Sequence, residues 1–458
     1  MKKLLFLAAF LLPMMANAQY GSLVEIPLYG DESSLVRLWT GHDSVLSYGQ
    51  AISGSVSKPT FFLSDYASFY SSTPPPVLST KYADLHATWG TMPLFFTHVR
   101  DMRIVDDYVF VCGDAGDTNN PLTAKSAIGW FNLNDFGTPN ITFQYFEIPI
   151  RVHYLKKIAA YRCGPGYTVL ALGEDANAKD YIFEIKDVTT LSSYYYVNYR
   201  EFTSSSFWDK EAADDILVTG NEVFVVGNLR TPPSERQLCI WKADRTNVVG
   251  DPQFYTRYDY TAASSEVNAN TYSTLIDEEY IATAYVHASD QTGPSDRLRI
   301  INTNTMNMVN SQEIIRDNKW EPEEMVYVNN RKKLVLLQEH NSIWNFILLE
   351  PMNNTAYVAD YLYHPNAVYY SLDSDHNDLF VSTGEKNRLY FQRLGMALPS
   401  PIGCPKNERI EVISIKDIPT SISPSLQSYG GNSAVVFTVW PPVIPTQIIP
   451  VCNSPLTK

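Results

Sequence analysis

The sequence predicts an all-β protein built from a repeated hairpin. A β-rich run of about five residues, bounded by turn-forming or charged residues, recurs along most of the chain. A second β-rich run follows each copy after a polar loop of variable length. The composition agrees, because Tyr is common (30 of 458 residues) while charged residues make up only 18%, a balance that suits sheets. Helix-period segments are scarce.

The first run of the repeat is clearest in "DDYVFVCGD" at 106–114. Its other copies are SVLSYGQ (44–50), GYTVLALGED (166–175), GNEVFVVGNL (220–229), EEYIATAYVHAS (278–289), RKKLVLLQEHN (331–341) and NDLFVSTGEKN (377–387). The partner runs are TFFLSD (60–65), AIGWFNL (127–133), YIFEIKD (181–187), QLCIWKAD (237–244), RLRIINTN (297–304), WNFILLEP (344–351) and RLYFQRL (388–394). Seven hairpins therefore follow one another, about 56 residues apart on average.

A period of this length leaves room for two further strands per unit, such as "HVRDMRIV" before the second hairpin and "ITFQYFEI" after it. Four short antiparallel strands per unit, stacked side by side so that both faces are buried, resemble the β-propeller superfold. The resemblance covers residues 19–397 and implies seven four-stranded blades, with six and eight as the alternatives. The repeat boxes of WD, kelch and sialidase propellers are missing, so no activity carries over.

The two ends of the chain are expected to differ from the repeats. The segment "SLVEIPLY" (22–29) precedes the first unit and is placed to supply the outer strand of the last blade. Residues 398–458 form a Pro-rich tail with two strand-like segments, "RIEVISIKDI" (409–418) and "SAVVFTVW" (433–440). This tail either completes the last blade or forms a small appendix.

The first residues indicate export. Lys2 and Lys3 lead an apolar stretch that ends in Ala16-Asn17-Ala18, so residues 1–18 are predicted to be a cleaved signal peptide. Cleavage would change the formal net charge from −14 to −16, because two Lys and no acid are lost. So acidic a chain is not expected to bind nucleic acid. No other apolar run is long enough for a transmembrane segment. We expect a periplasmic, cell-surface or extracellular protein.

The acidic cluster at 105–120 is predicted to be architecture rather than a site. Asp106 and Asp107 stand where Gly220-Asn221 stand in another unit, and tight turns favour such residues. Likewise "DSDHND" (373–378) is expected to be a plain turn, because Asp378 replaces the glycine of a calcium loop. The eight His residues show no zinc-ligand spacing. No metal and no cofactor are expected.

Five Cys residues leave at least one thiol outside any intramolecular pair. Cys112, Cys163 and Cys239 lie in or beside apolar runs and are expected to act as small buried hydrophobes. Cys404 and Cys452 bracket the tail, and in an exported protein they either form a disulfide or remain free thiols.

Candidate binding residues lie in the connections from each outer strand to the next inner strand, which gather on one face of a propeller. They are Trp208, Asp209, Trp320, Glu321, His153 and His364. Exposed rings stack on sugars or anchor peptides, and the charged groups would supply hydrogen bonds. The alternative is that the rings plug the channel or pack between blades.

These observations favour an exported, non-enzymatic binding or scaffold protein that recognises a glycan, a peptide or a partner protein. No nucleophile elbow, Walker loop or dinucleotide fingerprint is present. One alternative is a carbohydrate-active enzyme, a glycoside hydrolase or lyase, which two or three carboxylates converging on the channel would favour. Another is a purely structural surface protein. The sequence does not indicate an oligomeric state.

Overall fold

The strands form seven antiparallel sheets in the described part of the chain, numbered here I to VII around the ring. The computed structural model describes residues 23–27, 32–41, 44–53, 56–65, 80–83, 86–89, 92–116, 125–135, 144–147, 152–175, 180–189, 197–202, 210–231, 235–246, 248, 256–260, 271–289, 293–315, 321–340, 343–352, 355–359, 369–374, 378–385, 388–395, 410–412, 414–417 and 425–428.

The first three sheets follow the chain directly. Sheet I contains β2 (Glu32–Gly41), β3 (Ser44–Ser53), β4 (Val56–Asp65) and β5 (Thr80–Ala83). Sheet II contains β6 (His86–Trp89), β7 (Met92–Val105), β8 (Tyr108–Gly116), β9 (Lys125–Asn132) and β10 (Gln144–Glu147), and the short 3-10 helix η3 (Leu133–Asp135) follows β9. Sheet III contains β11 (Val152–Cys163), β12 (Gly166–Asp175), β13 (Asp180–Val188) and β14 (Val197–Phe202).

The next three sheets each take a fifth strand from the C-terminal tail. Sheet IV contains β15 (Lys210–Val218), β16 (Glu222–Thr231), β17 (Glu235–Asp244), β18 (Thr256–Tyr260) and β32 (Ser425–Ser428). Sheet V contains β19 (Tyr272–Ile276), β20 (Tyr280–Ser289), β21 (Gly293–Asn302), β22 (Met308–Ile315) and β31 (Ser414–Asp417). Sheet VI contains β23 (Glu321–Val328), β24 (Lys333–His340), β25 (Ile343–Glu350), β26 (Thr355–Ala359) and β30 (Ile410–Val412), with the 3-10 helix η5 (Asn329–Arg331) between β23 and β24.

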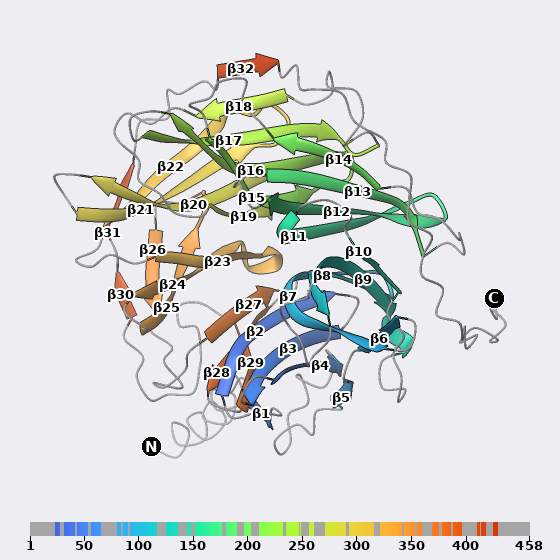
Figure 1. The fold of residues 1–458 in the computed structure, drawn as a ribbon. Coiled ribbons are helices and arrows are strands. Elements are labelled where there is room, and N and C mark those ends of the chain that lie inside the picture. The colour runs from blue at the N-terminus through green and yellow to red at the C-terminus, as the bar shows by residue number, and fades with distance from the viewer. Residues whose placement is uncertain are drawn as a thin grey trace, which may run out of the picture.

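Sheet VII joins the two ends of the repeat region. It contains β27 (Tyr369–Ser374), β28 (Asp378–Glu385) and β29 (Arg388–Gly395), and its outer strand is the N-terminal β1 (Leu23–Pro27). Strand β1 pairs antiparallel with β29, from Leu23 opposite Gln392 to Pro27 opposite Arg388. In Figure 1 the blue β1 lies beside the orange β29. This confirms the expectation that the segment 22–29 supplies the outer strand of the last unit.

The sheets form a closed ring. The inner strand of each sheet contacts the inner strand of the next, in the order β2, β7, β11, β15, β19, β23 and β27, and β27 contacts β2 again. Figure 1 shows the sheets arranged around a common centre. A ring of small antiparallel sheets with the N-terminal strand in the last sheet is the architecture of a β-propeller. The predicted propeller fold is confirmed, but four of the seven sheets in the described residues have five strands rather than the predicted four.

The predicted hairpins are the middle strands of the sheets. All seven pairs are antiparallel: β3–β4, β8–β9, β12–β13, β16–β17, β20–β21, β24–β25 and β28–β29. The turns that enter these hairpins hold residues in the left-handed region, including Asp106 (φ 50°) and Asp277 (φ 49°). Asp tolerates this conformation better than most residues. The prediction that the acids at 106–107 form a turn is confirmed.

The core lies between the sheets rather than inside one central layer. The described residues form six apolar clusters, and each cluster joins two adjacent sheets. Between sheets II and III, for example, Phe110 packs 5.3 Å from Tyr167, measured between ring centroids. Burying a large apolar side chain contributes about 1.5–3 kcal/mol. Within the described residues, each pair of neighbouring sheets except VII and I therefore has its own small core.

Tyrosine hydroxyl groups form hydrogen bonds between neighbouring sheets. Tyr161 of sheet III donates to the Arg245 carbonyl beyond β17 (2.6 Å), and Tyr260 of sheet IV donates to the Met306 carbonyl of sheet V (2.7 Å). A buried Tyr needs such a partner. Seam packing accounts for part of the high tyrosine content.

Two expectations about the remaining residues have different outcomes. Cys112 and Cys239 are buried free thiols, as predicted, whereas Cys163 is exposed at the end of β11, so its predicted burial is wrong. It stands beside Gly164 in the tight turn between β11 and β12, which faces solvent. The predicted signal peptide (1–18), Cys404, Cys452 and the segment 433–440 lie outside the described residues.

Candidate functional site

Four inner strands carry a β-bulge that is followed by a charged residue. In β7 the register shifts between Val99 and Asp101. Equivalent shifts precede Lys157 in β11, Asp215 in β15 and Glu324 in β23. A bulge leaves one residue unpaired and redirects the side chains next to it. The bulges therefore give four sheets a charged group at matching positions on their inner strands.

The repeated glycine of the sequence is explained by the same bulges. Gly113 pairs with Val99, the residue just before the register shift in β7. A β-carbon on Gly113 would lie 2.0 Å from the backbone oxygen of His98, which is too close for any other residue without a backbone shift. Gly173 and Gly227 hold the matching positions opposite the bulges of β11 and β15. The missing β-carbon of each glycine leaves space for the bulge, and the bulge sets the direction of the charged side chain that follows it.

Charged side chains from six sheets influence one another at the centre of the ring. We call this group the axial cluster, and it consists of Arg37, Asp101, Arg103, Lys157, Asp215, Glu324 and Asp373. Burial by itself lowers the pKa of Lys157, but the charges of Asp215 and Asp101 outweigh it, and the pKa is raised. Arg103 behaves in the same way, with Asp101, Asp215 and Asp373 raising its pKa against burial. Both cations therefore stay charged.

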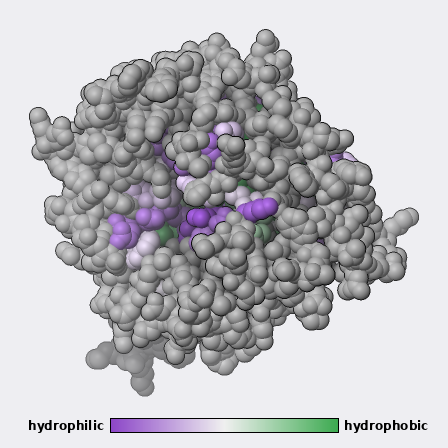
Figure 2. Space-filling view, in the orientation of Figure 1, coloured by the Kyte–Doolittle hydropathy of each residue, from purple (hydrophilic) through white to green (hydrophobic). Residues whose placement is uncertain are grey.

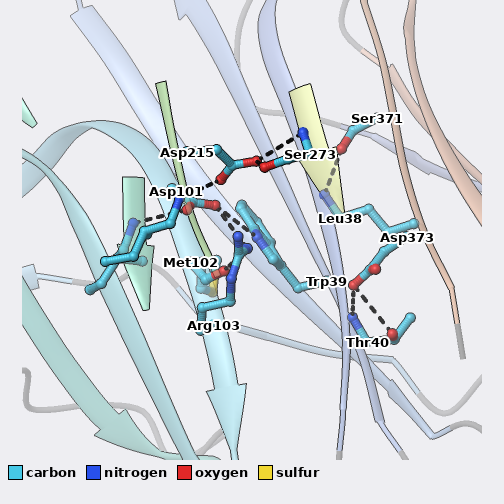
Figure 3. Close-up of polar contacts among 12 residues, drawn as sticks. Leu38, Trp39, Thr40, Asp101, Met102, Arg103, Asp215, Ser273, Ser371 and Asp373 are labelled. Atoms are coloured by element: carbon cyan, nitrogen blue, oxygen red, sulfur yellow. Dashed lines mark hydrogen bonds and ion pairs between the residues drawn. The ribbon is translucent and has the colours of Figure 1, made fainter. Parts of the chain in front are cut away.

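The carboxylates of the cluster accept backbone N–H groups from the next sheet. Asp101 Oδ2 accepts from Ile158 N (3.0 Å), Asp215 Oδ2 from Ser273 N (3.2 Å), and Asp373 Oδ2 from Thr40 N (2.7 Å). Figure 3 shows the last two contacts, and it shows Leu38 donating to Ser371 beside them. Glu324 Oε2 accepts from Leu372 N at 2.8 Å. Each acid thus bridges two inner strands.

Asp101 is the most highly connected of these acids. Its Oδ1 accepts from the indole of Trp39 (3.4 Å) and from Arg103 (3.1 Å), while its Oδ2 accepts from Ile158. It therefore links sheets I, II and III. The Asp101 side chain is only 6% exposed, whereas its ion-pair partner Arg103 is 36% exposed. The acid lies behind the cation as seen from solvent.

A fifth carboxylate also accepts a backbone N–H from the next sheet, but it lies on a middle strand rather than on an inner strand. Asp180, in β13, accepts from the backbone N of Ala213 in β15 (2.8 Å) and from Lys156 Nζ (2.6 Å). Lys156 also pairs with Glu174 at 2.7 Å. Burial raises the pKa of Asp180, and Lys156 acts against that rise. This network binds sheet III to sheet IV.

Burial raises the pKa of two acids of the cluster. Burial raises the pKa of Glu324, while Arg37, the Leu372 N–H and Lys157 oppose the rise. Burial also raises the pKa of Asp373, opposed by the N–H groups of Thr40 and Ser374. The neighbouring cations and N–H groups therefore act against the effect of burial at both acids.

Hydrophilic side chains gather near the middle of one face of the ring. Figure 2 shows them at the centre of the view. Arg103, Lys157, Glu324 and Asp373 each keep some exposed surface, in contrast to Asp101 and Asp215, which are buried. The axial cluster is accessible at its cations and at two of its acids.

The structure describes two of the six predicted binding residues, His153 and Glu321. Trp208, Asp209, Trp320 and His364 lie outside the described residues. His153 and Glu321 lie in β11 and β23 rather than in connecting loops, because both strands begin earlier than the sequence suggests. Beside His153, Tyr154 donates to Glu174 (3.0 Å) and lies under the Arg100 guanidinium, 5.3 Å from the ring centroid.

Adjacent charged residues in the inner strands are a sequence signal for the axial cluster, and they match none of the catalytic or metal-binding motifs considered above. Pairs of adjacent charged residues occur in four inner strands: Arg100-Asp101, Lys156-Lys157, Asp214-Asp215 and Glu323-Glu324. Each pair precedes the Gly or Gln of its hairpin by roughly 12 to 16 residues. Two adjacent charges cannot both face solvent in a regular strand, so such a pair indicates a bulge.

The described residues contain neither a metal-binding cluster nor a membrane-spanning helix. Within them, no three His, Cys, Asp or Glu side chains are grouped so that they could hold a metal ion. The same part of the chain has no helix long and apolar enough to cross a membrane.

Comparisons with known proteins find likeness in structure only. No family model matches the sequence, and no curated protein matches it. The propeller domain of the Trilobed protease from Pyrococcus furiosus is similar, with 9% identity, a TM-score of 0.45, and coverage of 80% of this chain and 96% of that one. The Dos1 propeller has 9% identity, a TM-score of 0.45, and coverage of 84% and 97%. Sqt1 from Chaetomium thermophilum, bound to the N-terminus of the ribosomal protein L10, has 8% identity, a TM-score of 0.42, and coverage of 80% and 99%.

Proposed function

We propose that the mature chain is an exported, seven-bladed, non-enzymatic propeller that binds an acidic group of a glycan, a peptide or a partner protein at the axial cluster. Export is supported by the signal-peptide pattern of residues 1–18. Seven blades are supported by the seven sheets of the described residues and by the ring of contacts between their inner strands. The ligand class is supported by the unequal use of acids and cations at the axis.

The observation that carries the proposal is that the axial acids bond to the protein itself, whereas Arg103 and Lys157 keep N–H groups that make no hydrogen bond within the described residues. Asp101, Asp215 and Asp373 each accept two or more hydrogen bonds from the protein itself. Arg103, by contrast, donates only through Nη1, to Asp101 and to the Met102 carbonyl, within the described residues. Lys157 donates no hydrogen bond in the same part of the chain. The remaining N–H groups of Arg103 and Lys157 can donate to a ligand, which favours a ligand rich in hydrogen-bond acceptors.

The cations also suit an acidic partner. The pKa of Lys157 and of Arg103 is raised by neighbouring acids, so both groups stay protonated at any physiological pH. A guanidinium offers several donors in one plane and can hold a carboxylate or sulfate at two points. The Asp101 carboxylate behind Arg103 holds the guanidinium in place, which lowers the entropic cost of binding.

An array experiment tests the proposal. The labelled mature chain, residues 19–458, is applied to neutral, uronate-containing and sulfated oligosaccharides and to neutral and acidic peptides. We expect acidic ligands to be retained, and we expect binding to weaken between about 50 mM and 500 mM NaCl as charges are screened. Preference for neutral ligands, no retained acidic ligand, or indifference to salt would contradict the proposal.

A carbohydrate-active enzyme is the second candidate, because carboxylates converge on the axis. Glu324 favours it: burial raises its pKa, and a protonated carboxyl is the general acid that glycosidic bond cleavage requires. Asp373, whose charge influences Glu324, would be its partner. Release of reducing ends from an array-selected glycan by wild type, but not by Glu324→Gln, would establish this activity. Equal release by both proteins would exclude Glu324 as the acid.

A further inference from the structure

The described strands of the C-terminal tail follow a regular path around the outside of the ring. Strand β30 pairs with β26 of sheet VI, β31 with β22 of sheet V, and β32 with β18 of sheet IV, all antiparallel. In Figure 1 these three strands lie at the periphery, beside the outer strands of their sheets. The tail therefore advances by one sheet per strand, in the direction opposite to the main chain.

The next sheet on this path has an open outer edge. Sheet III ends in β14, which pairs with β13 from Val197 opposite Ile185 to Phe202 opposite Asp180. No strand covers the other side of β14 among the described residues. An edge strand presents a row of N–H and C=O groups that favour pairing with another strand.

The chain beyond β32 carries a suitable strand. After Ser428 come Tyr-Gly-Gly-Asn (429–432) and then "SAVVFTVW" (433–440), which is uncharged, rich in β-branched and aromatic residues, and ended by Pro441 and Pro442. An uncharged segment of this kind promotes aggregation unless it is paired.

The length of the connection fits the same step. The tail takes eight residues to pass from Asp417 in sheet V to Ser425 in sheet IV. From Ser428 it reaches positions 433 to 436 in five to eight residues, which span about 17–28 Å when extended. Residues 433–440 can therefore begin pairing at the neighbouring sheet after a comparable distance.

We propose that residues 433–440 form a fourth tail strand, paired antiparallel with β14 as the fifth strand of sheet III. The tail then covers the outer edges of four consecutive sheets, and it buries the most aggregation-prone segment of the chain. The proposal is independent of the ligand at the axis.

Hydrogen exchange of the full-length protein, resolved to single residues in β14, tests the pairing. Alternate N–H groups of β14 point toward β13, and the others point outward. We expect both sets to be protected in the wild type, because the outward set would bond to residues 433–440. Protection of the inward set alone would overturn the proposal.

Two proline variants serve as mutual controls. Adjacent residues of a strand point their N–H groups to opposite sides, so only one of Val435 and Val436 would donate to β14. One of Val435→Pro and Val436→Pro should therefore speed exchange of the outward β14 set by roughly tenfold or more, and the other should change it little. The inward set should stay unchanged in both. Equal behaviour of the two variants, or protection that disappears on dilution as expected for a strand from a second copy, would contradict the proposal.

Discussion

Five buried or half-buried carboxylates hold the ring together through backbone N–H groups of neighbouring sheets: Asp101, Asp180, Asp215, Glu324 and Asp373. A hydrogen bond to a charged group contributes about 1.5–3 kcal/mol, and a buried partner left without it costs a similar amount. These acids therefore stabilise the junctions between neighbouring sheets with directional hydrogen bonds, which the apolar clusters do not supply.

Replacing Asp101 with Ala should destabilise the protein by about 3 kcal/mol, because the Ile158 N–H, the Trp39 indole and Arg103 all lose an acceptor. Urea unfolding of the mature chain measures the loss. Asp244→Ala is the matched control, because within the described residues the side chain of this acid accepts only from Thr246 in its own exposed turn. Similar losses for both variants would show that Asp101 does not bridge the sheets.

His98 should make stability depend on pH. Burial and then Arg100 lower the pKa of His98 to about 4, from an ordinary value of 6.5. The neutral ring is favoured by folding, so this contribution is complete above pH 6.5 and is lost as pH falls from 6.5 toward 4. The lost stability is on the order of 2 kcal/mol, given that the side chain is partly exposed.

The variant His98→Asn isolates this effect. Free energies of unfolding are measured for both proteins at several values between about pH 7.5 and 4.5. The advantage of the wild type should shrink steadily as pH falls. A constant difference between the two proteins would mean that the pKa of His98 is ordinary in the folded state.

At the scale of the strand, the repeat pattern located the hairpins but not the bulges, for which the adjacent charges of the inner strands are the sequence signal. The middle strands are bounded by turn residues and repeat in sequence, so "DDYVFVCGD" and its copies located them correctly. The inner strands are longer than the sequence pattern suggests; β7, for example, begins at Met92. Their bulges depend on which residue faces the neighbouring strand, as Gly113 faces Val99, and single-sequence periodicity does not encode that pairing.

Strand β1 should be needed for ring closure. A chain that starts at Leu28 leaves β29 as an open edge, and sheet VII then lacks the strand that comes from the same end of the chain as sheet I. We expect the urea midpoint to fall, with a loss of about 2 kcal/mol or more in the free energy of unfolding. A synthetic peptide covering residues 19–30 should restore stability by mass action, and a scrambled peptide should not. An unchanged midpoint in the shortened chain would rule out this role for β1.

At the scale of the whole molecule, the sequence predicted the ring but not its centre. The repeat implied stacked units, and closure of sheet VII by β1 followed from the order of strands. The axial cluster combines residues as distant as Arg37 and Asp373, and only the closed ring brings them together. The predicted aromatic residues were chosen for their place in connections, whereas Asp101 and Lys157 acquire their role from strand register.

The central claim is that the axial acids hold the ring while the axial cations hold the ligand. Calorimetric titration of the acidic array ligand into wild type, Lys157→Gln and Lys186→Gln tests it most directly. Lys186 lies on β13, where its side chain is 43% exposed and pairs with Glu184 outside the axial cluster. We predict that Lys157→Gln weakens binding by about tenfold or more, as expected for a lost charged hydrogen bond, and that Lys186→Gln leaves the affinity unchanged. Equal affinities of all three folded proteins would contradict the claim.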